Sequence, residues 1–220
     1  MLKTGYQTIK KVFKLPQILN FFGHWLSDRE KQEIIKIFKK SDANDQELYL
    51  KLKIYSLLKA LQKRRRKEFG FLVVFGWEKQ WLEDYASFPD ASQNLFSEKQ
   101  VSLIKLSFDK ALEIFSKLSY FDGAVLIGRK GNLVASGVYL ENMQPKAVAE
   151  KMKLKKTIDL SQAFGFAKKV HTRHLAGIAC SYKLPKTTVF VVSEESKVLR
   201  IFEKGKIVFS SLRQESATED

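Results

Sequence analysis

A carboxylate followed by two small residues, Asp122-Gly123-Ala124, begins an apolar run that ends at Ile127. The glycine lets the backbone approach a ligand closely or adopt a positive φ, and the alanine keeps the next position small. The carboxylate of Asp122 could bind a divalent metal or accept a proton from a sugar hydroxyl. A turn aspartate beside a turn glycine gives the same local pattern, so both interpretations stay open.

A second polar stretch, Thr172-Arg173-His174, opens an apolar helical pattern. Backbone N–H groups and the positive end of the helix dipole favour a phosphate at such a position. Arg173 adds a forked cation suited to phosphate oxygens, and His174 can donate a hydrogen bond to them. A surface helix with Thr172 as its N-cap explains the same residues.

A third polar stretch, Ser193-Glu194-Glu195, follows the apolar strand pattern that ends at Val192. A hydroxyl and two carboxylates at the end of a buried strand suit a ligand site. A strand that ends in a polar turn is the alternative. The order and spacing of the three stretches within one region strengthen the interpretation as a site.

The surrounding patterns predict a mixed α/β fold, with a mixed central sheet flanked by helices. The glycine-bounded apolar run 69–76 indicates a buried central strand, and a turn at 129–132 indicates a hairpin of 125–128 with 133–139. Further strands are predicted around Leu82 and over 187–192, 198–202 and 207–211. Helices are predicted from a capping box at 97–100 through Leu118, from an Asp159 cap through Phe164 and Ala167, and from Thr172 to Tyr182.

A small helical segment precedes this domain. Its first 26 residues indicate one or two short basic amphipathic helices, which could lie on a membrane surface, on the protein's own core or on another subunit. Ser27 and Asp45 are predicted to cap two longer helices. The run Lys63–Lys67 holds five cations in sequence, which suits either a nucleic-acid patch or a charged domain boundary. We favour the boundary, because no aromatic residues interleave the cations, and expect no nucleic-acid partner.

The composition bounds the class of protein. The chain has 220 residues, a net charge of +15 and 45% hydrophobic residues, which indicates a globular fold with a sizeable core. Residues 1–68 carry 17 of the 39 Lys and Arg but only 7 of the 24 Asp and Glu. The single cysteine, Cys180, excludes a disulfide framework and lies in an apolar run, so we expect a buried, inert thiol. With no signal peptide or membrane-spanning run visible, we expect a cytoplasmic protein.

From Phe69 to about Leu212, the chain resembles the diadenylate cyclase (DAC, or DisA_N) family. The matching segments are FGFLVVFG, FDGAVLI, GVYL, TRHLA and VVSEES, followed by a strand pair that contains KGK. The resemblance predicts a DAC-domain-like fold over residues 63–213 and says nothing about residues 1–60. The residue patterns themselves predict an N-terminal helical segment at 1–62 and a flexible tail at 214–220. We expect the N-terminal segment to govern oligomerisation.

The resemblance also implies a reaction. Members of the family condense two ATP into the second messenger cyclic di-AMP and two pyrophosphates, with Mn²⁺, Mg²⁺ or Co²⁺. Two domains, each holding one ATP, must face each other, so the resemblance implies a homo-oligomer with at least a head-to-head dimer. In phosphoryl transfer, the protein mainly positions the reacting groups and neutralises the charge of the phosphates.

The resemblance assigns roles by position. Asp122 would assist the 3′-hydroxyl, Gly123 and Ala124 would line the nucleotide, and Tyr139 and Leu140 would pack on adenine. Thr172, Arg173, His174 and Ser193 would hold phosphates, and Glu195, with Glu194 beside it, would bind the metal.

The chain departs from the family pattern at Leu175, where the family has the second arginine of Arg-His-Arg, and at Phe121, where many members have histidine. A lysine such as Lys168 or Lys169 could replace the missing cation. Because the other motif residues are present, we favour an active diadenylate cyclase. The rival hypothesis is a catalytically weak or inactive nucleotide-binding regulatory module.

Overall fold

The computed structural model describes residues 26–41, 43–65, 68–87, 101–155 and 159–215. The chain divides into two compact units, residues 1–64 and residues 65–220. The helices expected within residues 1–26 and the capping box at 97–100 lie outside the described residues, except for Leu26.

Among its described residues, the first unit contains two helices, α3 (Asp28–Lys39) and α4 (Asp45–Arg64). Ser27 caps α3 as predicted, because its Oγ accepts from the backbone N–H of Glu30. The Glu30 carboxylate joins the two helices, because it accepts from the hydroxyl of Tyr55 at 2.6 Å and lies 3.1 Å from Lys59 Nζ.

The cap of α4 differs from the prediction. Asn44, not Asp45, supplies it, since Asn44 Oδ1 accepts from Glu47 N while Asp45 is already helical.

The second unit is built on one sheet, as predicted. Within the described residues, eight strands form it in the order β2-β5-β4-β1-β6-β7-β8, with β3 also paired to β5. The central pair β1 and β4 is parallel and the other described pairs are antiparallel, so the sheet is mixed. The strands are β1 (Phe71–Trp77), β2 (Tyr85–Ser87), β3 (Val101–Ser102), β4 (Ala124–Gly128), β5 (Asn132–Leu140), β6 (Thr188–Val192), β7 (Leu199–Glu203) and β8 (Lys206–Ser210).

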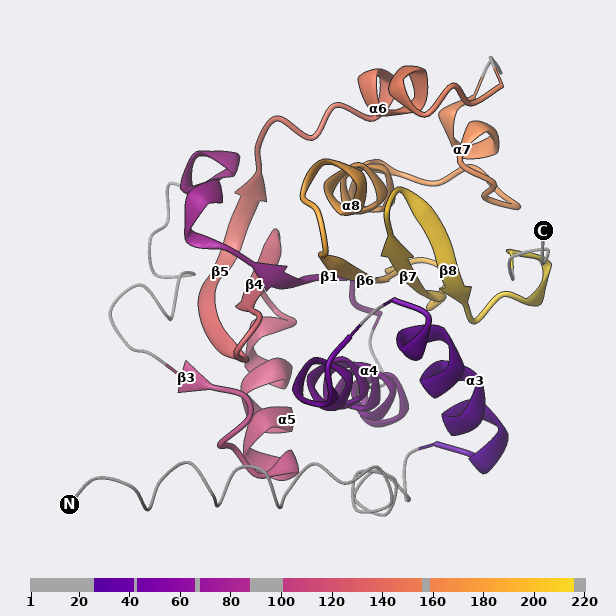
Figure 1. Cartoon of the computed structure of the whole chain (residues 1–220). Helices are drawn as coiled ribbons and strands as arrows, with labels where there is room; N and C mark the ends of the chain where they lie inside the picture. Colours follow the sequence, from indigo (N-terminus) through magenta and orange to yellow (C-terminus); the bar gives the residue numbers. More distant parts are fainter. Residues whose placement is uncertain (1–25, 42, 66–67, 88–100, 156–158, 216–220) are drawn as a thin grey trace. The chain divides into compact units, whose positions relative to one another are not determined.

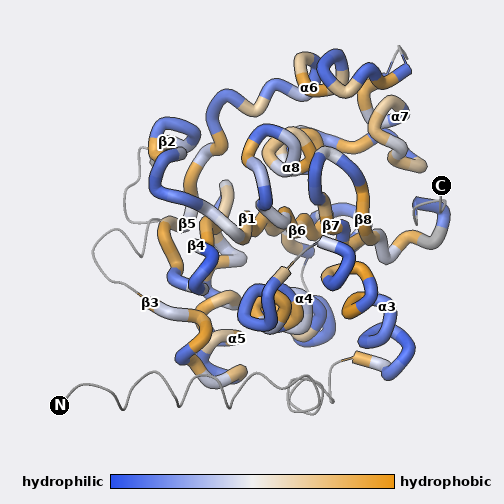
Figure 2. Tube along the Cα trace, in the orientation of Figure 1, coloured by the Kyte–Doolittle hydropathy of each residue, from blue (hydrophilic) through white to orange (hydrophobic). Residues whose placement is uncertain are grey.

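Helices cover both faces of this sheet (Figure 1). On one face, α6 (Pro145–Lys151), α7 (Leu160–Ala163) and α8 (Thr172–Lys183) enclose a core with residues such as Leu72, Val74 and Val191. On the other, α5 (Phe108–Leu118) packs Phe115 edge-on against Phe71. Alternate residues of a strand point to opposite faces of the sheet, so a strand that is covered on both faces is apolar along its whole length. β1 is buried at every residue, and the central strands are mostly hydrophobic in Figure 2.

Three predictions for this unit were wrong. The first is the helix expected from 97–100 through Leu118. Residues 101–102 instead form a strand paired with Leu133 and Asn132. The helix begins only at Phe108, because Ser107 caps it. Leu82 lies in the 3₁₀ helix η1 (Lys79–Asp84), and the strand follows at β2. The flexible tail expected from residue 214 is contradicted at residues 214 and 215, because they belong to the 3₁₀ helix η3 (Arg213–Glu215), in which the Glu215 side chain is buried.

Two further predictions concern single features. Asp159 caps α7, as expected, with its carboxylate accepting from Ser161 N, although this helix ends at Ala163. Cys180 is buried in the core on α8, as predicted, and burial raises the pKa of its thiol, which disfavours the reactive thiolate. Among the described residues, no helix has the length and apolar character needed to cross a membrane.

Candidate active site

The ends of three central strands, β1, β4 and β6, lie side by side where these strands begin or end (Figure 1). β1 pairs in parallel with β4, with Leu72 opposite Ala124, and antiparallel with β6, with Phe71 opposite Val192. The beginnings of β1 and β4 therefore lie beside the end of β6. This register brings Asp122, which precedes β4, to the same edge as Ser193, which follows β6.

An ion pair joins two of the predicted stretches at this edge. Arg173 NH2 donates to Asp122 Oδ1 at 3.0 Å. The same oxygen accepts from the backbone N–H of Gly123 at 2.8 Å, and Gly123 has a φ of +86°, which an L-residue adopts only with strain. The side chain of Asp122 is 70% exposed, so the carboxylate is oriented by Arg173 and still open to a ligand.

Gly70 makes room for this arginine. A Cβ atom at Gly70 would lie 1.7 Å from Arg173 NH1 and 2.5 Å from its Cζ. The guanidinium therefore passes directly over the backbone that enters β1. Any side chain at position 70 would displace it.

The first turn of α8 supplies the other polar groups. The residue that caps α8 is His171, whose backbone is extended and whose carbonyl accepts from His174 N at 3.1 Å. Thr172 was predicted as the cap and is instead the first helical residue, exposed to solvent. It does not line the cavity described next.

A cavity of about 510 Å³ lies against the start of α8. It brings together Arg173, His174, Ser193, Glu194 and Glu195 from the predicted site. The remaining lining residues are Lys168, Lys169, Val170, His171, Ser196, Val198, Arg200 and Leu212.

Its charges are mixed. Arg173 NH1 lies 3.6 Å from Glu194 Oε2, and His171 Nε2 lies 3.6 Å from Glu195 Oε1. The hydroxyl of Ser193 accepts from Ser196 N at 3.3 Å, so this stretch is both a polar turn and part of the cavity wall.

His174 is the buried member of the motif. Its ring stands edge-on to Phe166, and its Nε2 lies 3.0 Å from Arg200 NH1. Burial, together with the charges of Arg200 and Arg173, lowers the pKa of His174 to about 3. The imidazole is therefore neutral near pH 7.

The other predicted nucleotide contacts lie along β4 and β5. Ala124 is buried as the first residue of β4 and pairs with Val138, which places the next residue of β5, Tyr139, at the same sheet edge. Tyr139 is 52% exposed. Leu140 packs against the hydrophobic core and pairs with Tyr85.

Leu175 does not face the cavity. Its side chain packs against the hydrophobic core beneath α8. A leucine rather than an arginine at this position therefore serves the packing of the helix. The cavity takes its positive charge from Arg173, Lys168 and Lys169.

Metal binding was expected at Glu195. In the part of the chain that the structure describes, no group of three or more His, Cys, Asp or Glu side chains could hold a metal ion by itself. Glu195 and His171 offer two donors at the cavity wall. The Glu195 carboxylate fits Mg²⁺ or Mn²⁺, which proteins bind through one or two carboxylates while substrate phosphates and waters complete the shell. The imidazole of His171 is a donor more typical of Zn²⁺ and other transition metals.

Arg65, one of the five cations at 63–67, makes contacts within the second unit. Arg65 NH1 donates to the carbonyl and the hydroxyl of Ser119, and its guanidinium stacks 4.1 Å from the ring centre of Tyr120. At this residue the structure agrees with a boundary segment.

The sequence comparison identifies the family. The family described as "DAC: DisA bacterial checkpoint controller nucleotide-binding" matches residues 58–207. The chain belongs to the DAC family. The match covers all three predicted stretches, so the DAC resemblance is confirmed, and the cavity at the start of α8 lies in a nucleotide-binding domain.

Two solved structures are similar to this DAC chain. DacA from Staphylococcus aureus, a double mutant, is 18% identical, with a TM-score of 0.41 over 86% of this chain and 92% of that one. A hypothetical membrane-spanning protein from Bacillus cereus is 17% identical, with a TM-score of 0.43 over 91% and 93%. No curated protein matches significantly.

Sequence reasoning missed four residues of this DAC site. They are Gly70, His171, Arg200 and Glu215. Only Gly70 left a signal, as the glycine that interrupts an apolar run at the entrance to β1. The others act through contacts that sequence spacing does not reveal.

Proposed function

We propose that this DAC-family protein is a diadenylate cyclase, which condenses two ATP into cyclic di-AMP and two pyrophosphates. The observation that carries the proposal is the Asp122–Arg173 ion pair beside the cavity at the start of α8. It joins a carboxylate that can activate a hydroxyl to a helix start that can hold phosphates.

In this proposal each chain supplies one half-site. The 3′-hydroxyl of one ATP attacks the α-phosphorus of the ATP held by a facing chain. A new O–P bond forms, the bond from the α-phosphorus to the bridging oxygen breaks, and pyrophosphate leaves with the electron pair. Asp122 accepts the hydroxyl proton. Because one chain holds one ATP, the reaction requires at least a head-to-head dimer.

The other residues position the nucleotide. Tyr139 and Leu140 pack on the adenine, and Gly123 and Ala124 leave room for the sugar. Arg173, His174, Thr172 and Ser193 bind the phosphates. Glu195, with Glu194 beside it, would hold a divalent ion, Mn²⁺, Mg²⁺ or Co²⁺, which neutralises phosphate charge when bound.

The test is incubation of the protein with ATP and Mn²⁺, followed by chromatography for cyclic di-AMP. Product from the wild type and none from Asp122→Asn supports the proposal. ATP binding without any product contradicts it.

That second outcome would favour a nucleotide-binding regulatory module. The observation that favours this candidate is Leu175, which leaves the α8 start with Arg173 as its one motif arginine. Two carboxylates, on Asp122 and Glu194, already lie near that arginine. A regulatory module would bind ATP or cyclic di-AMP with the same residues but would not convert ATP into cyclic di-AMP and pyrophosphate.

A further inference from the structure

A buried ion pair lies behind the cavity. Arg200, on β7, is only 3% exposed and lies opposite Glu215 of η3. Its Nε donates to Glu215 Oε2 at 2.6 Å and its NH2 donates to Oε1 at 2.8 Å. This is the bidentate geometry in which a guanidinium and a carboxylate fix each other's orientation.

The remaining terminal nitrogen of Arg200 contacts the motif histidine. Arg200 NH1 lies 3.0 Å from His174 Nε2. A guanidinium has only donors, so the histidine nitrogen must be the acceptor in this hydrogen bond. A neutral ring that accepts at Nε2 carries its single proton on Nδ1.

Glu215 is itself held by three parts of the fold. Besides Arg200, it accepts from the hydroxyl of Ser210 on β8 at 2.8 Å and from Ala167 N, ahead of α8, at 3.0 Å. Burial alone would raise the pKa of Glu215, but these hydrogen bonds outweigh it and lower the pKa. The pair is therefore an anchored ionic unit.

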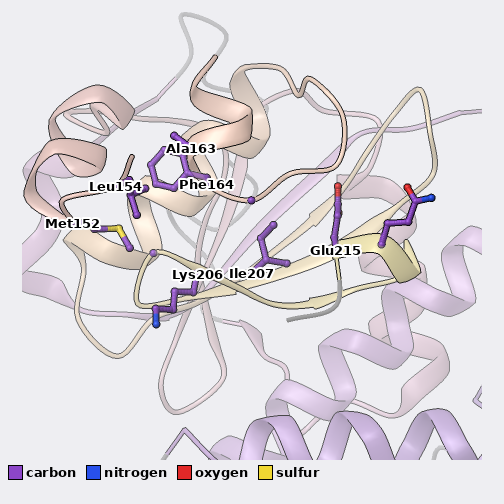
Figure 3. A pocket seen from close by; sticks show the side chains of 10 residues that line it. Met152, Leu154, Ala163, Phe164, Lys206, Ile207 and Glu215 are labelled. Atoms are coloured by element: carbon purple, nitrogen blue, oxygen red, sulfur yellow. The ribbon is translucent and has the colours of Figure 1, made fainter. Parts of the chain in front are cut away.

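Glu215 also lines a second cavity. This cavity of about 280 Å³ has Met152, Leu154 and Phe164 toward one end, while Ile207 and Glu215 lie toward the other (Figure 3). Arg200 lines the first cavity. Glu215 thus binds Arg200 through Nε and NH2, which leaves NH1 for the contact with His174.

Arg200 does not replace the arginine absent at position 175 as a phosphate cation. Glu215 neutralises its charge at short range, and its side chain is buried. Cations available to phosphates are Arg173, Lys168 and Lys169, which line the cavity with larger exposure.

We propose that Arg200 and Glu215 are positioning residues that hold the His174 ring and fix its proton on Nδ1. His174 then presents one defined N–H donor. The use of that donor on a phosphate rests on the proposed function, whereas the fixed tautomer is a property of the protein without ATP.

Ring ¹⁵N chemical shifts of histidine-labelled protein near neutral pH test the tautomer directly. The chain has three histidines, and His174→Gln identifies the signal. We expect a neutral ring with hydrogen on Nδ1. Hydrogen on Nε2, or a doubly protonated ring, in the wild type overturns the proposal whatever the variants show.

The double variant Arg200→Met/Glu215→Gln removes the donor and its counter-charge together, so no buried charge is left unpaired. We expect the fixed Nδ1–H tautomer to be lost. Arg200→Lys, which keeps a charge opposite Glu215 but lacks the fork, should lose it too and serves if the double variant fails to fold. A folded variant that keeps the Nδ1–H tautomer contradicts the proposal.

The matched control is Arg129→Met/Glu78→Gln. This pair is also an Arg–Glu contact, with Nε 2.7 Å from Oε1, but it lies at the far end of β4 from Asp122. The His174 signal should stay unchanged in it. A change of similar size would show that loss of any such pair perturbs the ring.

Binding of ATP separates this proposal from the proposed function. The Kd for ATP should rise about tenfold in Arg200→Lys and stay unchanged in the Arg129 control, as expected for one weakened hydrogen bond to a charged group. If the tautomer is as expected but no cyclic di-AMP forms, the cyclase proposal fails and the positioning role stands. An unchanged Kd overturns the role in ATP binding.

Discussion

Asp122 and Arg173 lie 51 residues apart in the sequence, and their side chains meet at 3.0 Å. The contact joins the strand β4, which begins with the small residue Ala124, to the helix α8. Each stretch alone could be an ordinary turn or an ordinary helix start. Their contact in the fold makes the combination a candidate for chemistry on a phosphorylated sugar.

Asp122→Asn tests the role of this carboxylate. We expect cyclic di-AMP formation to fall by about 10²- to 10⁴-fold, because the amide cannot accept the hydroxyl proton. The Kd for ATP should change much less. Chromatography of the product and calorimetry of ATP binding measure the two effects. Asp109→Asn, at an exposed residue of α5, is the matched control and should keep full activity.

Gly70→Ala tests the space over which Arg173 passes. The added methyl group would overlap Arg173 NH1, and the flexible arginine rather than the backbone should yield. ATP affinity should fall by about tenfold while the free energy of unfolding changes little.

A double-mutant cycle sharpens this test. In an Arg173→Ala background, Gly70→Ala should cost nothing further, because no guanidinium remains to be displaced. Additive losses of ATP affinity would show that Gly70 acts by another route.

Glu195→Gln tests the metal site. Removing the carboxylate of Glu195 should raise the Mn²⁺ concentration needed for half-maximal activity, with a smaller change at saturating metal. A titration of activity against Mn²⁺ at fixed ATP measures it. Glu150→Gln, on the exposed face of α6, should behave as wild type. Equal shifts in both variants would remove Glu195 from the metal site.

The pH dependence of stability should report His174. Its pKa is lowered from 6.5 to about 3 in the folded protein, so between these values the unfolded chain binds a proton that the folded chain does not. The free energy of unfolding should therefore be unaffected by this group above pH 6.5 and fall as the pH drops, by up to about 1.4 kcal/mol per unit.

Denaturant unfolding of the wild type and of His174→Gln between pH 7 and pH 4.5 measures this difference. Glutamine can accept from Arg200 through its amide oxygen but does not titrate. Its stability should fall less steeply with acidification. Parallel curves would mean that His174 has an ordinary pKa.

Removing residues 1–60 tests the proposed assembly role of the N-terminal helical segment. We expect the oligomeric mass from light scattering to decrease, with the loss of cyclic di-AMP formation that a missing dimer implies. A folded fragment of unchanged oligomeric mass would assign the segment another role.

The sequence predicted the fold where local patterns are strong. The glycine-bounded run before Trp77 is the central strand, and the hairpin around Gly131 is where the turn residues indicate it. The helix expected from the capping box at 97–100 was wrong at Val101, because strand pairing with Leu133 determines that residue's conformation. Propensity and capping signals cannot foresee such a partner.

Part of the candidate site was also predicted from the sequence, and part was missed. The motif residues Arg173 and His174 were predicted from a helix start and from the family resemblance, and the structure places both at one cavity. Arg200 was missed because a lone cation in a β-strand pattern usually indicates a solvent-facing position. Its burial depends on Glu215, which lies beyond the last strand and outside any sequence motif.

The position of Glu215 also limits where the domain can be cut. The family match ends at residue 207, inside β8, and a fragment trimmed there would lack the carboxylate that pairs with Arg200. A buried guanidinium without its counter-ion typically costs about 3–5 kcal/mol, a large part of the stability of a small domain. Expression of the DAC domain alone should therefore retain η3, even though that turn lies outside the matched residues of the family.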